Sequence, residues 1–566
     1  MKECVYFFER EVDGRRYRIA AQSVWDSEQG RSVARQVTLG PADPLPKVDL
    51  RATRTFGTRA MGNVGALVWV AEQLDLVARI DRACGHHGSK SSPSIGEMVV
   101  AVAIQRACLP GPKSDLAAFL EGSLPRSSCL RASAFTGQAF HRLAQKVTDA
   151  ELDAAQISIA KAAIQNFKLS ADVLAFDTTN FDTHIATTTP GELARRGHAK
   201  SKRSDLRVVG LGLLVSEVGH VPLLYRSYAG NSSDQRVLQS CLDSLTQLHD
   251  ALDEGEGRDQ PAQRTLVRDG ASWSPQIELG LEVAGYHTVI SLPLGHSAAA
   301  YALERAARPK AMKRLKGRYN DVRVARVRTK VGKLDRTLIV VESQELLEGQ
   351  KRGVAVALNK AEQELAKLER LVQAGRIRRQ NLERRIDKAL QREHLKSFVV
   401  TDVGGTDEAP TFTWRVDPRR RKRLERTRLG RRVLCTDRHS WSAEQVVHAF
   451  RGQWNVEELF RRSKKGGVVP WGPSFQWTDS SLRLHTFATV VGLMLVSLAK
   501  LALDTDASVP TMMKSLAAIR VTLVRTTTGG KGRRPTVPLA PELNAAQRHA
   551  VEVFELDRWL PAFLHV

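Results

Sequence analysis

Three acidic residues stand where they could take part in metal chemistry. Asp177 follows the apolar run VLAF, Asp269 comes at the end of TLVRD, and Glu457 lies within SAEQVVHAFRGQWNVEELFRRSKK. Mg²⁺ prefers oxygen ligands, and two divalent ions about 3.5–4 Å apart can drive in-line displacement at a phosphodiester. Carboxylates gathered without such ions would repel one another. The three residues together therefore predict a two-metal site.

Each acidic residue also has a plainer interpretation when it is taken alone. An Asp after a strand is often a turn former or a helix cap, and Glu457 could be a solvated helix residue. The joint arrangement of the three residues favours the metal site over these alternatives.

The elements that must position the two aspartates lie between residues 171 and 295. The segments ADVLAFDTTNF, LRVVGLGLLVSEVGHVPLLYRSYAG, QRTLVRD and YHTVISLP predict strands, and SDQRVLQSCLDSLTQL predicts a helix capped by Ser232 or Ser233. With the helix SWSPQIELGLEVAG, the expected order is β-β-β-α-β-α-β. The first strand is expected to end at Asp177 and the fourth at Asp269. Continuous apolar strands indicate a sheet that is covered on both faces.

Glu457 is expected on one long helix that begins after Ser442. Ser442 is the predicted N-cap, and Gln445 stands at the capping-box position. Residues seven apart drift only about 20° around a helix, so Phe450, Glu457 and Lys464 would share one stripe.

The remaining segments change their periodicity along the chain. EVDGRRYRI predicts a hairpin because Asp-Gly supplies the positive φ of a tight turn. Residues 60–170 show the 3–4 residue spacing of helices, and a charged helical stretch near residues 361–395 is expected to break at Gly375. RTLIVVES and SFVVTDV predict strands beside that stretch. The apolar run near 487–503 predicts a buried helix that falls short of a membrane span.

These patterns predict an α/β protein in six segments. They are a small β-rich element (1–58), a helical region expected to bind DNA (59–170), the first part of a catalytic core (171–295), a mixed α/β insertion with basic helices and strands (296–438), the second part of the core with the Glu457 helix (439–505), and a partly helical tail with the basic loop TTTGGKGRRP (506–566).

The charge of the chain points to a polyanionic partner. Its 566 residues include 85 Lys and Arg against 61 Asp and Glu, a net charge of +24. Nucleic acid is the commonest partner of so basic a protein, although a basic protein can also owe its charge to solubility alone. The six cysteines lack pairing spacings, and the N-terminus lacks the apolar core of a signal peptide, so a reduced cytoplasmic setting is expected. Cys84 lies beside His86 and His87, but no CxxC follows and no zinc site is expected.

Four segments together resemble the DDE transposases of bacterial insertion sequences, in the branch with a long insertion before the final Glu. They are FDTTNF; RGHAKSKRSDLRVVGLGLLVSEVGHVPL followed by YAGNSSD; LVRDGASWS; and FRGQWNVEELFRRSKK followed by WTDSSLRLHTF. They occur in the family's order and span roughly residues 170–500, more than half of the chain.

The resemblance implies an RNase H-like core that binds two Mg²⁺ ions, with Mn²⁺ as a possible substitute, and that cuts DNA at terminal inverted repeats. It places Asp177, Asp269 and Glu457 at the catalytic and metal-binding positions, since the family spacing after Trp454 selects Glu457 over Glu458. It also implies a homodimer, because two element ends must meet in a synaptic complex, and it implies no membrane partner.

The match departs from the family pattern at Phe450 and Gln453, where Tyr and Arg are usual. These changes remove a hydroxyl and a phosphate-pairing charge, for which nearby arginines could compensate. The expected DNA-binding residues are Lys464, Lys465, Arg461, Arg451, Lys200 and Arg203. The two lysines could instead complement the helix dipole, and Lys200 and Arg203 could belong to an ordinary basic turn.

Two other functions stay open at the level of sequence. One is an RNase H-fold nuclease that cleaves DNA without strand transfer. The other is a domesticated DNA-binding protein that has lost catalysis, although the presence of all three acidic residues argues against it.

Overall fold

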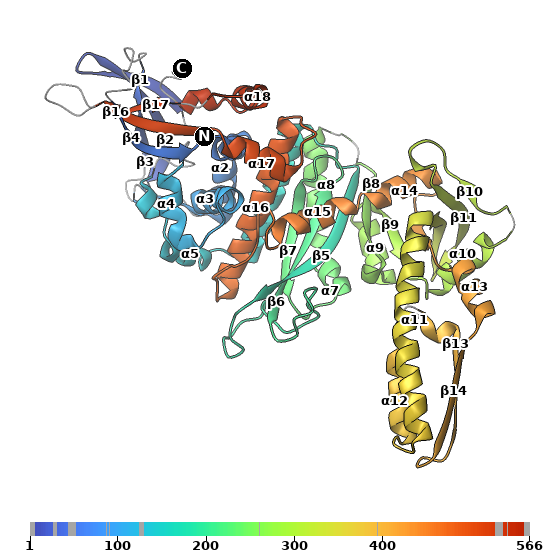
Figure 1. The fold of residues 1–566 in the computed structure, drawn as a ribbon. Coiled ribbons are helices and arrows are strands. Elements are labelled where there is room, and N and C mark those ends of the chain that lie inside the picture. The colour runs from blue at the N-terminus through green and yellow to red at the C-terminus, as the bar shows by residue number, and fades with distance from the viewer. Residues whose placement is uncertain are drawn as a thin grey trace. The chain divides into compact units, whose positions relative to one another are not determined.

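The computed structural model describes residues 6–26, 31–42, 53–85, 88–89, 91–123, 130–257, 259, 261–308, 310–392, 394–526, 536–539 and 542–559. The chain divides into two compact units. Unit 1 contains Met1–Leu266, Leu279–Tyr286 and Gly452–Val566, and unit 2 contains Val267–Glu278 and His287–Arg451. Figure 1 shows the elements of both units. His86, His87 and the basic stretch 527–535 lie outside the described residues.

Unit 1 begins with the predicted hairpin. Strands β1 (Tyr6–Val12) and β2 (Arg15–Asp26) pair antiparallel, and Val12 faces Arg15 across the turn. Asp13 and Gly14 both have positive φ, 51° and 71°, as a two-residue turn of this kind requires. The hairpin prediction is confirmed, and β3 (Arg31–Pro41) completes a three-stranded sheet.

A second small sheet in unit 1 joins distant parts of the sequence. Strand β4 (Thr53–Ala60) pairs with β16 (Arg520–Thr526), which also pairs with β17 (Thr536–Leu539). The sequence did not predict this pairing, because nothing local in either segment indicates its partner.

The helical region of unit 1 is confirmed. It contains α1 (Gly62–Gln73), α2 (Leu76–Cys84), α3 (Ile95–Cys108), α4 (Leu116–Glu121), α5 (Gly137–Ala144) and α6 (Asp149–Phe167), followed late in the chain by α16 (Asp479–Ala502), α17 (Val509–Ala517) and α18 (Ala545–Val553). Helix α16 packs against α1, α3 and α5. It is buried over almost its whole length because apolar residues occupy every face.

Helix α16 corrects one expectation from the sequence. Because it starts at Asp479, before the apolar run, its 24 residues do reach the length and apolarity of a membrane span. It is the one such helix among the described residues, and 89% of its apolar window is buried inside the protein.

The strands that carry Asp177 and Asp269 follow the predicted order. Strands β5 (Val173–Thr183), β6 (Arg207–Ser216), β7 (Pro222–Ala229) and β8 (Arg264–Asp269) lie in the order β8-β5-β6-β7, with α7 (Asp234–Gln239) and α8 (Leu242–Glu256) between β7 and β8 in the chain. Ser233 is the N-cap of α7. Strand β8 ends at Asp269, as predicted. Strand β5 does not end at Asp177, because Thr178 and Thr179 are buried and their β-branched side chains continue the strand.

Unit 2 contains an antiparallel set of strands in the order β10-β11-β12-β15-β9, and β9 is also the neighbour of β8. Their bounds are β9 (Tyr286–Leu292), β10 (Lys313–Arg314), β11 (Val322–Val331), β12 (Leu334–Ser343) and β15 (Arg431–Thr436). Helix α9 (Pro275–Val283) precedes β9, and α10 (Ser297–Ala306) follows it.

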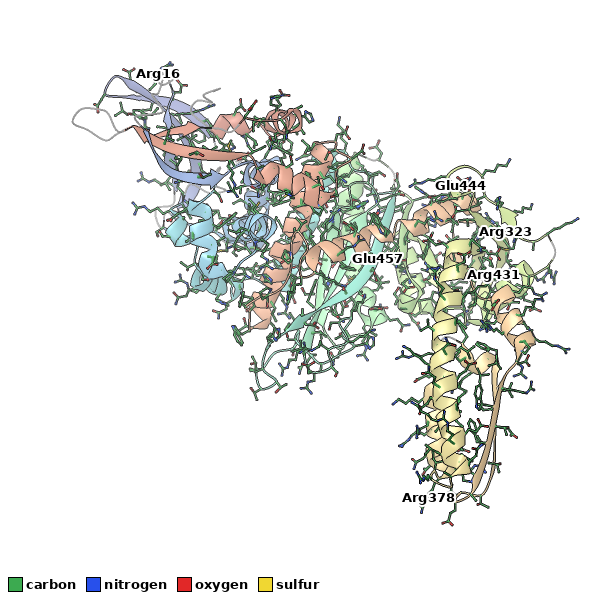
Figure 2. The ribbon with its side chains drawn as sticks, in the orientation of Figure 1. Arg16, Arg323, Arg378, Arg431, Glu444 and Glu457 are labelled. Atoms are coloured by element: carbon green, nitrogen blue, oxygen red, sulfur yellow. The ribbon has the colours of Figure 1, made fainter. Side chains whose placement is uncertain are left out.

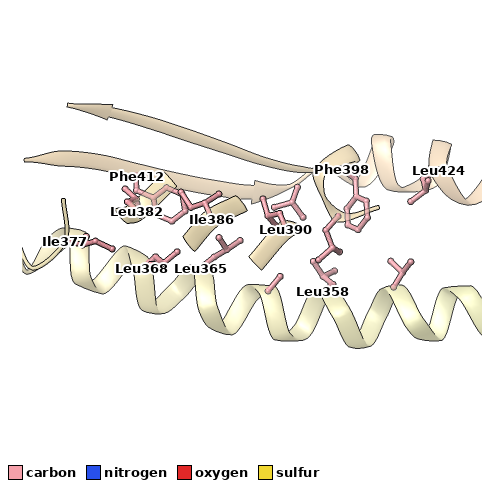
Figure 3. Packing of buried hydrophobic residues seen from close by; sticks show 14 of the residues in the cluster. Leu358, Leu365, Leu368, Ile377, Leu382, Ile386, Leu390, Phe398, Phe412 and Leu424 are labelled. Atoms are coloured by element: carbon pink, nitrogen blue, oxygen red, sulfur yellow. The ribbon is translucent and has the colours of Figure 1, made fainter. Parts of the chain in front are cut away.

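Residues 344–429, within the predicted insertion 296–438, form a packed layer of their own in unit 2, whereas β10, β11, β12 and β15 of the same predicted segment join the sheet of β9. Helices α11 (Gln344–Gln373) and α12 (Arg379–Leu390) pack with the hairpin of β13 (Val399–Gly405) and β14 (Pro410–Val416), and α13 (Pro418–Thr427) follows. Gly375 has φ 64° between the two helices, so the predicted break there is confirmed. Figure 3 shows the apolar cluster that we call the insertion core, made of Val354, Leu358, Ala361, Leu365, Leu368, Ile377, Leu382, Ile386, Leu390, Leu395, Phe398, Val399, Phe412, Leu424 and Leu429.

The prediction of one long helix after Ser442 is wrong. The Ser442–Gln445 capping box is present, but α14 (Ala443–Arg451) stops before Gly452, and α15 (Trp454–Ser463) starts afresh. Glycine is unfavourable inside a helix. After Gly452, the chain makes a tighter turn than an α-helix, because the Asn455 N–H donates to the Gly452 carbonyl three residues earlier, with an N–O distance of 3.0 Å. The division between the units also falls between Arg451 and Gly452. Phe450 and Glu457 therefore lie on different helices, and Lys464 lies beyond the end of α15.

Candidate active site

Asp177 lies half-buried in the middle of β5, opposite Leu213 of β6. One of its carboxylate oxygens accepts the N–H of Thr178 at 2.7 Å. The Thr178 hydroxyl donates to Asp234 at the start of α7, also at 2.7 Å. Burial raises the pKa of the Tyr228 hydroxyl, and the neighbouring Asp234 and Asp177 carboxylates raise it further. The Tyr228 hydroxyl itself donates to the Thr179 carbonyl of β5 at 3.0 Å.

Lys200, in the loop that precedes β6, is held against β5 at Thr178 and Asn180. The Lys200 ammonium donates to the Thr178 carbonyl, and its backbone N–H donates to Asn180 at 3.0 Å. The amide of Asn180 in turn donates to the His198 carbonyl at 2.9 Å. A cation is thus fixed next to the strand that carries Asp177, where it can offset negative charge.

Glu457 projects from α15 (Figure 2), and this helix packs against β5 and β6 within unit 1. The side-chain amide of Asn455 anchors the helix by donating to the Glu217 carbonyl at 3.0 Å. Glu457 is exposed, and among the described residues no side chain pairs with its carboxylate. It therefore remains available to a ligand.

The neighbouring Glu458 has a structural role instead. It pairs with Arg461 at 2.8 Å and with the buried Arg462 at 3.2 Å. Arg462 also donates to Ser497 of α16 at 3.2 Å, so Glu458 helps to join α15 to α16. The structure separates two adjacent acidic residues that the sequence could distinguish only through the resemblance.

Asp269 is exposed at the end of β8, in unit 2, and accepts the N–H of Gly270 at 2.7 Å. The residue before it is the buried one. Arg268 is fully buried and ion-paired with Glu278, and it donates to the Ser272 hydroxyl at 3.0 Å. The Ser272 hydroxyl donates to the Asp269 carbonyl at 2.8 Å. The buried Arg268 therefore fixes the turn after β8 through Ser272, while the Asp269 side chain is exposed.

The residues that support these acids were not predicted from the sequence. Glu278 also accepts hydrogen bonds from Thr288 at 3.0 Å and Arg336 at 3.4 Å, so three donors share one buried carboxylate. An arginine in an apolar run was the one signal for this network, and its partner is ten residues away. Asp234, the other missed acid, ends the YAGNSSD segment that contributed to the resemblance.

The basic residues expected to bind DNA differ in whether their side chains already contact other residues of the chain. Arg203 is engaged by Asp205 at 2.5 Å, which also lowers the pKa of that exposed aspartate to about 2. Arg461 pairs with Glu458 and lies over the Trp454 ring at 5.8 Å.

Arg451 belongs to unit 2, where it lies 4.5 Å from the centre of the Tyr319 ring. Lys464 and Lys465 are exposed and have no side-chain partner among the described residues. Of the residues expected to bind DNA, these two lysines are therefore the most accessible to a phosphate.

The donor chemistry of the three acids suits Mg²⁺, because each offers carboxylate oxygens and two of them are exposed. Two acids lie on elements of unit 1 that pack together, β5 and α15. The third, Asp269, belongs to unit 2. Within the described parts of the chain, no three His, Cys, Asp or Glu side chains are gathered closely enough to bind one metal ion.

Comparison with known proteins gives a likeness to solved structures. No protein-family model matches the chain, and no curated protein matches it. Among solved structures, the chain is similar to a transposase in a synaptic complex with hairpin DNA. That protein is piggyBac transposase, with 10% identity and a TM-score of 0.37 over 80% of this chain and 78% of that chain.

Proposed function

We propose that this protein is the transposase of a bacterial insertion sequence, which cuts and joins DNA at terminal inverted repeats by a cut-and-paste route. The observation that carries the proposal lies within unit 1, where a helix packed on β5, the strand of Asp177, presents the unpaired Glu457. The four motifs that resemble DDE transposases and the net charge of +24 support it. We further propose that β5 to β9 and α15 form an RNase H-like core, which the insertion interrupts.

In this proposal, Asp177, Asp269 and Glu457 hold two Mg²⁺ ions. Bound ions of this kind activate water and stabilise the oxygen that leaves the phosphorus. Water attacks the phosphodiester at an element end and frees a 3′-hydroxyl, and this hydroxyl then attacks target DNA. The chain contributes position and charge: Lys200 lies beside β5, and Lys464 and Lys465 neutralise phosphate.

The remaining parts of the chain bind and align the DNA. The helices of residues 59–170 recognise the inverted repeat, and the basic surface of the insertion holds the backbone through salt-sensitive contacts. Two copies of the chain bring two element ends together.

A strand-transfer assay tests the proposal. The substrate is a labelled, precut duplex that carries the terminal repeat from the DNA flanking the gene, mixed with plasmid and Mg²⁺. The wild-type protein is expected to join the two. Asp177→Asn, Asp269→Asn and Glu457→Gln are expected to lower the joining rate at least about 100-fold. Glu444→Gln is the matched control, since Glu444 is an exposed acid on α14 (Figure 2) and should stay active.

Two outcomes would replace the proposal by its alternatives. Cleavage without joining would identify a nuclease, and binding without either reaction would identify a DNA-binding protein. Titration calorimetry with Mn²⁺ tests the shared site directly. An Asp269→Asn protein that binds as much Mn²⁺ as the wild type would show that Asp269 does not belong to the metal site.

A further inference from the structure

The connection between α15 and α16 buries two polar residues and exposes two aromatic ones. We call residues 471–478, with the sequence WGPSFQWT, the aromatic loop. Its Ser474 and Gln476 are only 8% and 3% exposed, while Phe475 and Trp477 are 53% and 58% exposed. The hydrophobic effect favours the opposite arrangement.

A buried lysine and histidine fix the polar side of the aromatic loop. The Lys113 ammonium donates to the Ser474 carbonyl at 3.3 Å and lies 2.7 Å from Nδ1 of His485 on α16. The Gln476 amide donates to the same Ser474 carbonyl at 3.0 Å. The opposite ring nitrogen of His485 lies 2.8 Å from the Trp471 carbonyl.

The first residue of the loop is anchored as firmly. The Trp471 ring stacks on Phe181 of β5 with centroids 4.9 Å apart and planes 9° apart. Its indole N–H donates to Thr486 at 3.0 Å. Arg106 donates to the Gly472 carbonyl at 3.3 Å, so contacts reach the loop from α3, β5 and α16.

Holding Phe475 and Trp477 outward has a cost. Phe475 has φ 54°, in the left-handed region that bulky side chains avoid. The Gln476 Oε1 atom is buried without a hydrogen-bond partner among the described residues. Strain and burial of this kind persist where a function selects them.

We propose that Phe475 and Trp477 form a stacking platform for unpaired nucleobases of the DNA substrate. Aromatic rings bind bases of any sequence, because every base has a π-face, and a basic surface beside them holds the phosphates. The inference rests on the proposed function only in taking DNA as the substrate.

The charges beside the loop fit this occupant. After α15 the chain turns back, so that residues 469–471 pair with the end of the helix. The Val469 N–H donates to the Arg462 carbonyl at 3.0 Å, and the Trp471 N–H donates to the Ser463 carbonyl at 2.7 Å. The free cations Lys464 and Lys465 lie in the turn between these paired segments. An aromatic pair with cations on the same connection complements a single strand, in which bases and phosphates alternate.

Fluorescence anisotropy of the full chain tests the proposal. The probes are a labelled oligothymidylate of about 20 nucleotides and a blunt duplex of equal length. Trp477→Ala and Phe475→Ala are each expected to weaken binding of the single strand about ten-fold and to leave duplex binding unchanged. Trp477→Phe keeps a ring and should restore most of the affinity, whereas Phe475→Leu keeps apolar surface without a ring and should not.

Two further readouts separate stacking from charge and from packing. The ring variants should leave the slope of log affinity against log salt unchanged, while Lys464→Ala and Lys465→Ala should each reduce it by about 0.7. Both rings are exposed, so their alanine variants should melt within a few degrees of the wild type. Fluorescence of 2-aminopurine in the single strand should be quenched by the wild type but not by Trp477→Ala.

Three results would overturn the platform. They are unchanged single-strand affinity in both alanine variants, an equal loss on duplex and single strand, and a change in molar mass by light scattering that marks the rings as a contact between copies. Asp177→Asn distinguishes the two proposals, because it should bind the single strand as the wild type does. If strand transfer fails while this binding pattern holds, only the proposed function falls.

Discussion

The insertion core and the aromatic loop are built on opposite principles. In the insertion core, apolar residues at helical spacing, such as Leu365, Leu368, Leu382 and Ile386, are buried against one another (Figure 3). In the aromatic loop, the polar residues Ser474 and Gln476 are buried, while two aromatic residues, Phe475 and Trp477, are exposed.

The difference shows which region folding alone explains. Burial of apolar area at about 25 cal/mol per Å² is reason enough for the insertion core. It gives no reason for the aromatic loop, where more apolar area would be buried if the rings turned inward. A function other than folding is required there, and the two regions should therefore respond differently to mutation.

The largest expected effect is a cavity in the insertion core. Leu365→Ala should lower the free energy of unfolding of unit 2 by about 2–5 kcal/mol, because the removed side chain is fully buried. Chemical denaturation followed by circular dichroism measures it. Val356→Ala is the matched control on the same helix, since Val356 is 56% exposed and its truncation should change stability by less than about 0.5 kcal/mol. Similar losses in both variants would show that the insertion core does not dominate the stability of this layer.

The sequence predicted the helices that form the insertion core because their signals are local. The spacing of Leu382, Ile386 and Leu390 indicates a helix, and Gly375 indicates its start. Asp269 could be placed at a strand end for the same reason, since TLVRDG contains both the strand and the residue that ends it. Local signals were misleading at Asp177, where β-branched threonines extend the strand, and at Gly452, which divides the expected helix.

The aromatic loop could not be predicted from its own residues. Its conformation depends on Lys113 and His485, and Lys113 is more than 350 residues away in the sequence. The buried pair of Arg268 and Glu278 escaped prediction for the same reason on a smaller scale. An interior polar contact is visible in the sequence only as a residue that does not fit its surroundings.

Removing the buried lysine should weaken the aromatic loop more than it weakens any other part of unit 1. Lys113→Met fills the space but removes one of the two donors to the Ser474 carbonyl and the partner of His485 Nδ1, at a cost of about 1–3 kcal/mol. Hydrogen exchange by mass spectrometry should show faster exchange in residues 469–478 and little change in α11. If exchange in the loop stays at the wild-type rate, the buried cation is not what fixes it.

A smaller effect is expected from acidification. Burial lowers the pKa of His485 well below 6.5, and the Lys113 and Arg106 cations lower it further. The unfolded chain therefore takes up a proton first, so stability should fall as pH drops below 6.5, by at most about 1.4 kcal/mol per pH unit. Denaturation midpoints measured from pH 7.5 to 5 test this. His485→Gln, which cannot titrate, should show a shallower decline, and an equal decline would assign the pH dependence to other groups.

The smallest effect is a gain in stability at Phe475. This residue holds φ 54°, a conformation that costs an L-amino acid about 1–2 kcal/mol and costs glycine almost nothing. Phe475→Gly removes that strain, and it loses little packing because the ring is 53% exposed. Glycine also gives the unfolded chain more freedom, which offsets about 0.5–1 kcal/mol of the gain. The variant should therefore be more stable than the wild type by about 0.5–1 kcal/mol in denaturant, whereas Phe475→Ala, which keeps the strain, should not be. A protein that becomes more stable when an exposed ring is removed, and at the same time binds single-stranded DNA less tightly, would show that Phe475 is retained for binding at the expense of folding. A loss of stability in Phe475→Gly would instead mean that the ring is held by packing, and the contrast with the insertion core would disappear.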